Sequence, residues 1–367
     1  MNVPFVDLKA QYLNIKSEVD EAVAAVFEDS VFVGGSFVSK FEKSFCEFYN
    51  VNHCIGVGNG TDALFLILKA LGIGIGDEVI TPAHSWISTA ETISFTGATP
   101  VFTDVDGGHY LITPEGISSK INSKTKAIIV VHLYGQAAPV KEIAEFCKKH
   151  NLFLIEDCSQ AHLTEESNQL VGKFGVASAF SFYPTKNLGA YGDAGCVITS
   201  DSVLAIKIRR LANHGGLGKD EHLMEGTNSR LDSLQAAILS VKLKHLKKWT
   251  DQRIQNASLY YSLLKEVKEI VLPHLRPDTK HTFHLFVIKT KRRNELKSFL
   301  ESHGIQTMIH YPTALPFEPA YSHLKHSKED FPIALGLSQE VLSLPIYPEL
   351  SEEQIVYVCE RIKDFHR

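Results

Sequence analysis

The first candidate for chemistry is a lysine in a turn. Lys186 follows the apolar, strand-like run Ala179–Phe182 and shares its turn with Pro184 and Gly189. A lysine buried among aromatic residues at a strand end loses its proton more easily than one in water, and its neutral amine can attack a carbonyl carbon. Lysines near Pro and Gly turns are otherwise mostly solvated surface residues. The turn alone leaves both interpretations open.

A second strand-like run, Leu152–Ile155, leads into an acid, Asp157. Burying a carboxylate costs free energy unless the carboxylate is paired. The protonated ring nitrogen of pyridoxal phosphate would be such a partner, and the same cofactor has a carbonyl that a lysine can attack. Asp157 and Lys186 would then hold opposite ends of one cofactor.

A glycine-rich turn, Gly56–Gly60, runs directly into an apolar helical segment that ends near Leu71. Free amides and the positive dipole end at a helix N-terminus attract phosphate, and glycine lets the backbone approach closely. An ordinary capped helix after a turn would look the same. The spacing fails the G-x-G-x-x-G pattern, and Asp62 comes too early for a ribose contact, so a Rossmann dehydrogenase is disfavoured.

Alternating strand-like and helix-like segments between about residues 54 and 215 position these groups. The expected strands are Glu78–Thr81, Pro100–Thr103, Ala127–Val131, Leu152–Ile155, Ala179–Phe182 and Cys196–Thr199. Expected helices include Ser85–Thr96 and Val140–His150. Apolar strands separated by helices indicate an α/β fold with a mostly parallel sheet covered on both faces. Ligands of such sheets bind beyond the carboxyl ends of the strands, where Asp157 and Lys186 fall.

The pattern changes near Leu239 to long amphipathic helices followed by a few strands, which predicts a small α+β lobe. Its expected elements are a strand over Leu285–Ile288, a helix over Asn294–His303, a strand over Ile305–Ile309 and a closing helix over Ser351–Phe365. We therefore expect a large α/β domain over residues 1–240, including the N-terminal segment, and a smaller C-terminal domain over residues 241–367.

Composition disfavours several classes of protein. The 367 residues carry a formal net charge of −5, which argues against a nucleic-acid-binding surface. The densest basic run, residues 242–248, has helical spacing and is expected to form a solvated face. The six cysteines lie singly and several fall in apolar runs, which indicates reduced core residues. The 17 histidines show no ligand spacing, so we expect no metal site.

The chain start, Met1–Phe5, lacks a basic region followed by an apolar stretch, and no run of about 18 apolar residues predicts a membrane span. We therefore expect a cytoplasmic protein without a membrane partner.

In this order, the motifs resemble the pyridoxal-phosphate-dependent sugar aminotransferases of the DegT/DnrJ/StrS family, which have the aspartate aminotransferase type of fold, fold type I. The resemblance covers nearly the whole chain. It begins at Val3–Leu8, continues through the glycine turn and Thr81–Ala90, and ends beyond His310–Pro312. It implies a large, mostly parallel sheet flanked by helices, with a smaller C-terminal α+β domain.

The resemblance implies roles for eight residues. Lys186 would form the Schiff base with the cofactor and act as the general base, and Asp157 would pair with the pyridinium nitrogen. The other implied contacts are Gln160 near the phenolic oxygen of the ring, Gly60, Thr61 and Ser181 at the phosphate, Trp86 stacked on the ring face, and Asn228 reaching the phosphate of the neighbouring active site in a homodimer.

Each of these contacts has a plainer alternative. Trp86 could be a core residue, and Ser181 a satisfied buried hydroxyl. Asn228, together with Arg230, could cap a helix that starts near Leu231. Gln160 and His162 follow a strand in a polar loop, where solvated side chains are the default, and His162 receives no role.

The implied reaction is the ping-pong transfer of an amino group, with glutamate as the expected donor, to a nucleotide-linked keto sugar. The segment Asn187–Gly195 resembles members that aminate carbon 3, so we expect a dTDP-linked 3-keto-6-deoxyhexose in deoxyamino-sugar biosynthesis, with a 4-keto sugar as the alternative. One departure from the family is that Thr313–Pro316 has no histidine. Sugar contacts by His310 or Tyr311 therefore do not follow from the resemblance.

Two other activities fit the same cofactor. A related enzyme could dehydrate or deoxygenate the sugar, but some such relatives replace the lysine with histidine, and Lys186 argues against them. A non-catalytic cofactor-binding regulator would need a DNA-binding extension or a basic face, and the sequence predicts neither.

Overall fold

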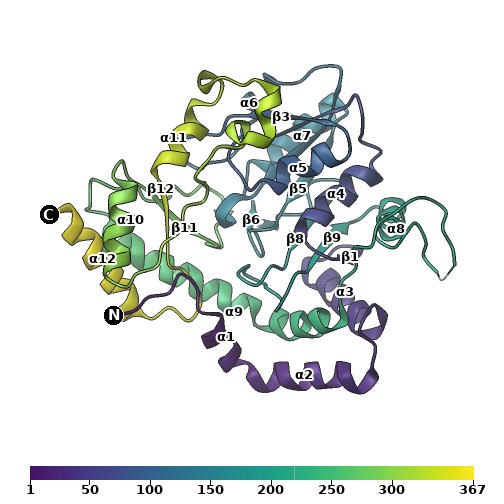
Figure 1. Cartoon of the computed structure of the whole chain (residues 1–367), viewed down its shortest axis with the longest axis horizontal. Helices are drawn as coiled ribbons and strands as arrows, with labels where there is room; N and C mark the ends of the chain where they lie inside the picture. Colours follow the sequence, from purple (N-terminus) through teal and green to yellow (C-terminus); the bar gives the residue numbers. More distant parts are fainter. Residues whose placement is uncertain (219) are drawn as a thin grey trace.

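The computed structural model describes residues 1–218 and 220–367, and a seven-stranded sheet lies at its centre (Figure 1). In spatial order the strands are β1 (His53–Val57), β9 (Gly195–Thr199), β8 (Ala177–Ser181), β5 (Phe153–Asp157), β4 (Thr125–Val131), β2 (Glu78–Pro82) and β3 (Thr99–Thr103). Strand β9 is antiparallel to both of its neighbours, and the other pairs are parallel. The predicted mostly parallel sheet is confirmed, with each of the six expected strands within about two residues of its predicted ends.

Both faces of this sheet are covered, which explains its apolar strands. In β4, Ile128 and Val130 pack into one core, whereas Ala127 and Ile129 pack into the core on the opposite face. This alternation follows from the two-residue period of a strand, and burial on both faces removes the need for polar positions.

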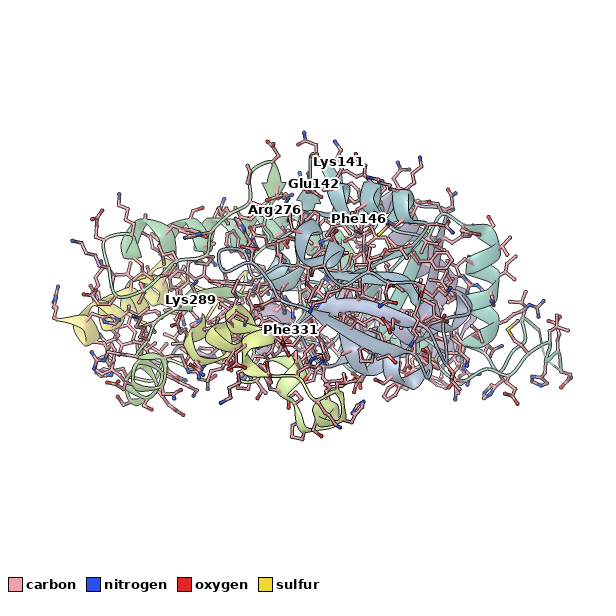
Figure 2. All side chains as sticks on the ribbon, turned by 90° about the horizontal axis from the view of Figure 1, so that it is seen from above. Lys141, Glu142, Phe146, Arg276, Lys289 and Phe331 are labelled. Atoms are coloured by element: carbon pink, nitrogen blue, oxygen red, sulfur yellow. The ribbon has the colours of Figure 1, made fainter. Side chains whose placement is uncertain are left out.

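Helices from the whole chain cover the two faces. One face is packed by α4 (Gly60–Ala70), α5 (Ser88–Phe95) and α8 (Ser202–Leu211), and the other by α3 (Gly35–Tyr49), α6 (Pro114–Ser118), α7 (Val140–His150) and the first half of α9 (Ser233–Leu264). The predicted helix over Val140–His150 is confirmed with the same bounds. Lys141 and Glu142 of α7 are exposed at the surface of the molecule (Figure 2).

A second, smaller sheet lies in the C-terminal part. It pairs β11 (Phe286–Lys289) with β12 (Val341–Leu344), and it packs with α10 (Arg293–Ser302), α12 (Glu352–His366) and the end of α9 around its own apolar core. The two predicted helices are confirmed to within one residue. The predicted strand over Ile305–Ile309 is wrong, because this segment pairs only at single positions, Ile305 with Val3 and Met308 with Ser343.

Helix α9 connects the two cores over 32 residues (Figure 1). It packs against α2 (Lys16–Asp29) and α3 near its start and against α12 near its end. Residues 314–334 return to the large sheet, where the ring of Phe331 (Figure 2) lies 6.4 Å from that of Phe102. The division of the chain between residues 240 and 241 stays a prediction.

The remaining elements are short. They are α1 (Leu8–Asn14), α11 (Pro332–Glu340), a three-stranded sheet of β6 (Glu165–Glu166), β7 (Gln169–Leu170) and β10 (Thr279–Lys280), and 3-10 turns over Leu133–Gly135, Leu315–Phe317, Pro319–Leu324 and Lys328–Asp330. Among the described residues, every helix is too short or too polar to cross a membrane.

Candidate active site

A pocket of about 420 Å³ opens at the carboxyl end of the large sheet. Seven of the eight residues predicted from the sequence line it: Gly60, Thr61, Trp86, Asp157, Gln160, Ser181 and Lys186. They come together because β5 and β8 run parallel, so the ends of these strands meet at one edge. Asn228 does not line the pocket of its own chain.

The turn that carries Lys186 is tight, and Gly189 makes it so. A Cβ atom at Gly189 would lie 2.2 Å from the carbonyl oxygen of Pro184, so no other residue fits without moving the backbone. The backbone N–H of Lys186 donates to Tyr183 O at 2.8 Å, and that of Ala190 donates to Phe182 O at 2.7 Å. The lysine therefore leaves β8 on a compact, internally bonded turn.

Burial lowers the pKa of Lys186 from its ordinary value to about 8, and the negative charge of Asp157 opposes that change. Loss of hydration disfavours the ammonium form, whereas the carboxylate favours it. About a tenth of Lys186 is then the free amine at pH 7, far more than for an ordinary lysine, and this is the form that attacks a carbonyl or removes a proton.

Asp157 is 6% exposed and keeps acceptor capacity on the pocket side. Its Oδ1 accepts from the N–H of Ser159 at 3.0 Å, and its Oδ2 accepts from Oγ1 of Thr89 at 3.3 Å. Two carboxylate oxygens can accept about four hydrogen bonds, so Asp157 can accept a further one from a cationic N–H in the pocket. This end of the pocket fits a protonated ring nitrogen.

The opposite end is the N-terminus of α4. The Asn59 side chain caps the helix by accepting from the N–H of Asp62 at 2.8 Å. The first-turn amides of Gly60 and Thr61 have no protein acceptor in the part of the chain that is described. A Cβ at Gly60 would lie 2.7 Å from Cβ of Ser181, so the backbone must be bare here. This end of the pocket fits a phosphate group.

Gln160 and Trp86 form the walls between these ends. Oε1 of Gln160 accepts from the N–H of Tyr134 at 2.7 Å, and its Nε2 donates to the hydroxyl of Tyr311 at 2.9 Å. Gln160 is therefore buried, and the default of a solvated side chain was wrong. Trp86 is 57% exposed and lies 5.7 Å from the Tyr311 ring, so it is not a core residue.

His162 is also buried rather than solvated. Its ring lies 5.4 Å from that of Phe180 and 5.7 Å from that of Phe182, and within the described residues neither ring nitrogen has a hydrogen-bond partner. Burial lowers the pKa of His162 to about 3, with a smaller contribution from the positive charge of Lys186. The side chain is therefore an uncharged part of the core beneath the pocket.

Asn228 is exposed, but its segment is fixed to the phosphate end of the site. Oγ of Ser229 donates to Oδ2 of Asp62 at 2.7 Å and accepts from the N–H of Gly58 at 3.0 Å. The N-cap of α9 is Asp232, so the alternative that Asn228 caps this helix is wrong.

Sequence reasoning missed two residues that hold the predicted ones in place. Thr89 donates to Asp157, and it lies at the start of α5 within the motif Thr81–Ala90, so the motif contained a usable signal. Tyr134 orients Gln160 through its backbone N–H, which no side-chain pattern reveals.

A lysine and an acid at neighbouring strand ends, facing a bare helix N-terminus across one pocket of a mostly parallel sheet, define a fold type I pyridoxal phosphate enzyme. Within that class, the chain belongs to the DegT/DnrJ/EryC1/StrS aminotransferase family, whose profile matches residues 13–363. The chain is thus a sugar aminotransferase, and its cofactor is pyridoxal phosphate.

Relatives match over the full length. The chain is 44% identical to a pleiotropic regulatory protein of Geobacillus stearothermophilus, covering 100% of this chain and 99% of the relative. It is 43% identical to dTDP-3-amino-3,6-dideoxy-alpha-D-galactopyranose transaminase of Aneurinibacillus thermoaerophilus, covering 99% of each. The crystal structure of DesV from S. venezuelae in complex with a ketimine intermediate matches with a TM-score of 0.97 and 40% identity, over 99% of this chain and 98% of that one.

Proposed function

We propose that this aminotransferase moves an amino group from glutamate to carbon 3 of a dTDP-linked 3-keto-6-deoxyhexose. The observation that carries the proposal is the meeting of Lys186, Asp157 and the α4 N-terminus in one pocket. The choice of carbon 3 is supported by the Aneurinibacillus relative, whose name describes a 3-amino sugar, and by the segment that follows Lys186.

The lining residues fit the cofactor at both ends. Asp157 would hold the ring nitrogen protonated, and Gln160 would lie beside the phenolic oxygen. Gly60, Thr61 and Ser181 would bind the phosphate, and Trp86 would cover the ring face. When bound, the cofactor supplies an electron-withdrawing ring that stabilises negative charge on the carbon next to the transferred nitrogen.

Lys186 would perform both covalent attachment and proton transfer. Its amine would hold the cofactor in the resting enzyme and would become free when the donor amine takes its place. The free amine would remove the proton from the donor's α-carbon and return it two atoms away, on the far side of the transferred nitrogen, and it would repeat these transfers in reverse on the keto sugar. A pKa near 8 suits both directions, because neither protonation state is strongly favoured.

We further propose a homodimer in which Asn228 of the partner subunit completes each phosphate site. Asn228 is exposed and is not part of its own pocket. The region around α2 also exposes apolar side chains, namely Phe27, Val31, Phe32 and Val33. A cytoplasmic location is proposed as well, because the six cysteines are free thiols.

Mixing inactive subunits tests the shared site. Heterodimers of Lys186→Ala and Asn228→Ala subunits should regain part of the activity, because one of their two pockets would contain both native residues. A mixture with no more activity than the separate variants would place Asn228 outside the neighbouring pocket.

The function itself is tested with purified protein, pyridoxal phosphate and glutamate. The assay offers dTDP-linked 3-keto and 4-keto 6-deoxyhexoses, and mass spectrometry and NMR identify the product. Amination at carbon 3 supports the proposal, and amination only at carbon 4 overturns the choice of carbon. Bound cofactor without amination of either sugar would favour a dehydratase or a regulatory role, such as the name of the Geobacillus relative describes.

A further inference from the structure

Lys242 of α9 is buried, although its basic run was expected to face solvent. The residue is 1% exposed, whereas Lys244, Lys247 and Lys248 are exposed as predicted. Helical spacing alone did not distinguish these positions. A buried ammonium is costly unless it has partners, so its partners indicate why a lysine stands here.

The partners of Lys242 belong to the turn that carries Lys186. Its Nζ donates to the carbonyl oxygen of Gly189, and it lies 4.6 Å from the centroid of the Tyr191 ring. The electron-rich face of the ring adds a cation–π attraction. Burial lowers the pKa of Lys242 to about 7, and the charge of Glu349 opposes that shift.

A second residue of α9 holds the same turn. Oε1 of Gln235, seven residues before Lys242 and therefore on the same side of the helix, accepts from the N–H of Tyr191 at 2.8 Å. A Cβ at Gly192 would lie 2.9 Å from Nε2 of Gln235, so helix and turn are in close contact. The turn is thus fastened to α9 at two points.

The helix also holds a second segment of the pocket lining. Arg253 lies eleven residues, or about three turns, after Lys242, and it is 4% exposed. Its Nη1 donates to the carbonyl oxygens of Ile346 at 2.8 Å and Phe283 at 3.2 Å, beside the lining residue His284. One helix therefore binds backbone carbonyls both in the Lys186 turn and beside His284.

We propose that Lys242 is a positioning residue for the transamination reaction. By binding the Gly189 carbonyl, it fixes the direction in which the turn presents the Lys186 amine to the carbonyl carbon and to the proton that is moved. Arg253 ties the same helix to the segment that contains His284, whose Nδ1 lies 3.3 Å from Oδ1 of Asn187 in the Lys186 turn. The proposal rests on the function proposed above for Lys186.

Three variants separate positioning from mere packing. Lys242→Met keeps the length of the side chain and removes the donor, Lys242→Arg keeps a cationic donor, and Lys244→Met is the matched control on the exposed face. Because a displacement of about 1 Å can lower a rate about 100-fold, we expect Lys242→Met to reduce kcat by about 10- to 100-fold with a smaller change in KM. Lys242→Arg should recover part of the loss, and Lys244→Met should match the wild type.

A cofactor-free measurement tests the same point independently. Competitive acetylation of the apoprotein across pH, followed by mass spectrometry of the Lys186 peptide, gives the pH midpoint of this amine. In Lys242→Met the midpoint should rise above that of the wild type, since a loosened turn lets water reach Lys186 and favours the ammonium. A folded Lys242→Met protein with unchanged midpoint and kcat would overturn the proposal. If Lys242→Met does not fold, the test uses Lys242→Arg. A folded Lys242→Arg protein whose Lys186 midpoint and kcat equal the wild-type values supports the proposal. A folded Lys242→Arg protein that loses kcat while its Lys186 midpoint stays at the wild-type value refutes the proposal.

Failure of the underlying function would look different. Wild-type protein that takes up no pyridoxal phosphate, as judged by its visible absorbance, would refute the role of Lys186 itself. The acetylation midpoint would still show whether Lys242 controls the turn.

Discussion

The last two residues of β5 are both acids, but their surroundings differ. They point to opposite sides of the sheet, as the strand alternation requires. Glu156 is fully buried and accepts hydrogen bonds from the backbone N–H of Gly172 (2.6 Å), Phe174 (2.7 Å) and Gly175 (2.7 Å), and it lies 3.1 Å from Nε2 of His132. Asp157 has two donors and faces the pocket.

The difference separates a structural acid from a functional one. The Ala138 N–H donates to Nδ1 of His132, so the proton of this imidazole lies on Nε2 and points at Glu156. Glu156 thus finds all its partners inside the protein and fixes the loop over residues 172–175. Asp157 has acceptor capacity left over, and that capacity is what a bound cation uses.

The largest expected effect on activity comes from replacing Lys186. Lys186→Ala should lower amination by at least about 1,000-fold, because it removes both the nucleophile and the base. Its free energy of unfolding should stay equal or rise, since a lysine with a depressed pKa is lost. Steady-state assays measure the loss of amination, and urea unfolding measures the change in the free energy of unfolding. Activity within tenfold of the wild type would contradict the assignment.

Asp157→Asn should come next, with kcat lower by about 100- to 1,000-fold, as is typical when one preorganised electrostatic partner is removed. The amide cannot keep a ring nitrogen protonated, but its oxygen can still accept from the N–H of Ser159, and the Thr89 hydroxyl can turn to accept from its NH₂. Urea unfolding should therefore show a change below about 1 kcal/mol. A large loss of stability with little loss of kcat would make Asp157 a structural acid.

Glu156→Gln should show the reverse pattern. An amide NH₂ would meet backbone N–H groups, leaving buried donors unpaired, so the free energy of unfolding should fall by about 3 kcal/mol. The kcat of the folded fraction should stay within about tenfold of wild type. If kcat instead fell as far as in Asp157→Asn, the two acids would not have separate roles.

A smaller effect concerns pH. Uptake of pyridoxal phosphate by the apoprotein should accelerate as pH rises through about 8, because the ammonium form of Lys186 cannot attack and the free amine can. The charge of Asp157 raises the Lys186 pKa, so Asp157→Asn should move the midpoint to lower pH, whereas Glu156→Gln should leave it in place. Stopped-flow absorbance across pH measures the midpoints. An equal shift of the midpoint in both variants would contradict the separate roles of the two acids.

Much of this arrangement could be predicted because it is local. Asp157 and Lys186 each follow an apolar strand, and parallel strands bring such ends together. The burial of Gln160 could not be foreseen, because Tyr311, which accepts its hydrogen bond, lies 151 positions later in the chain. The burial of Lys242 could not be predicted for the same reason. Gly189 is 53 residues away from it, and helical periodicity does not identify which side of a helix a distant turn will cover.

The bond between Gln160 and Tyr311 has a consequence for protein synthesis. A growing chain emerges from its N-terminus and folds as it is made. It therefore exposes the reactive lysine well before the wall that contains Tyr311 leaves the ribosome. We expect prematurely terminated chains to meet the cofactor without retaining it, so that retention marks a chain whose translation has passed this point.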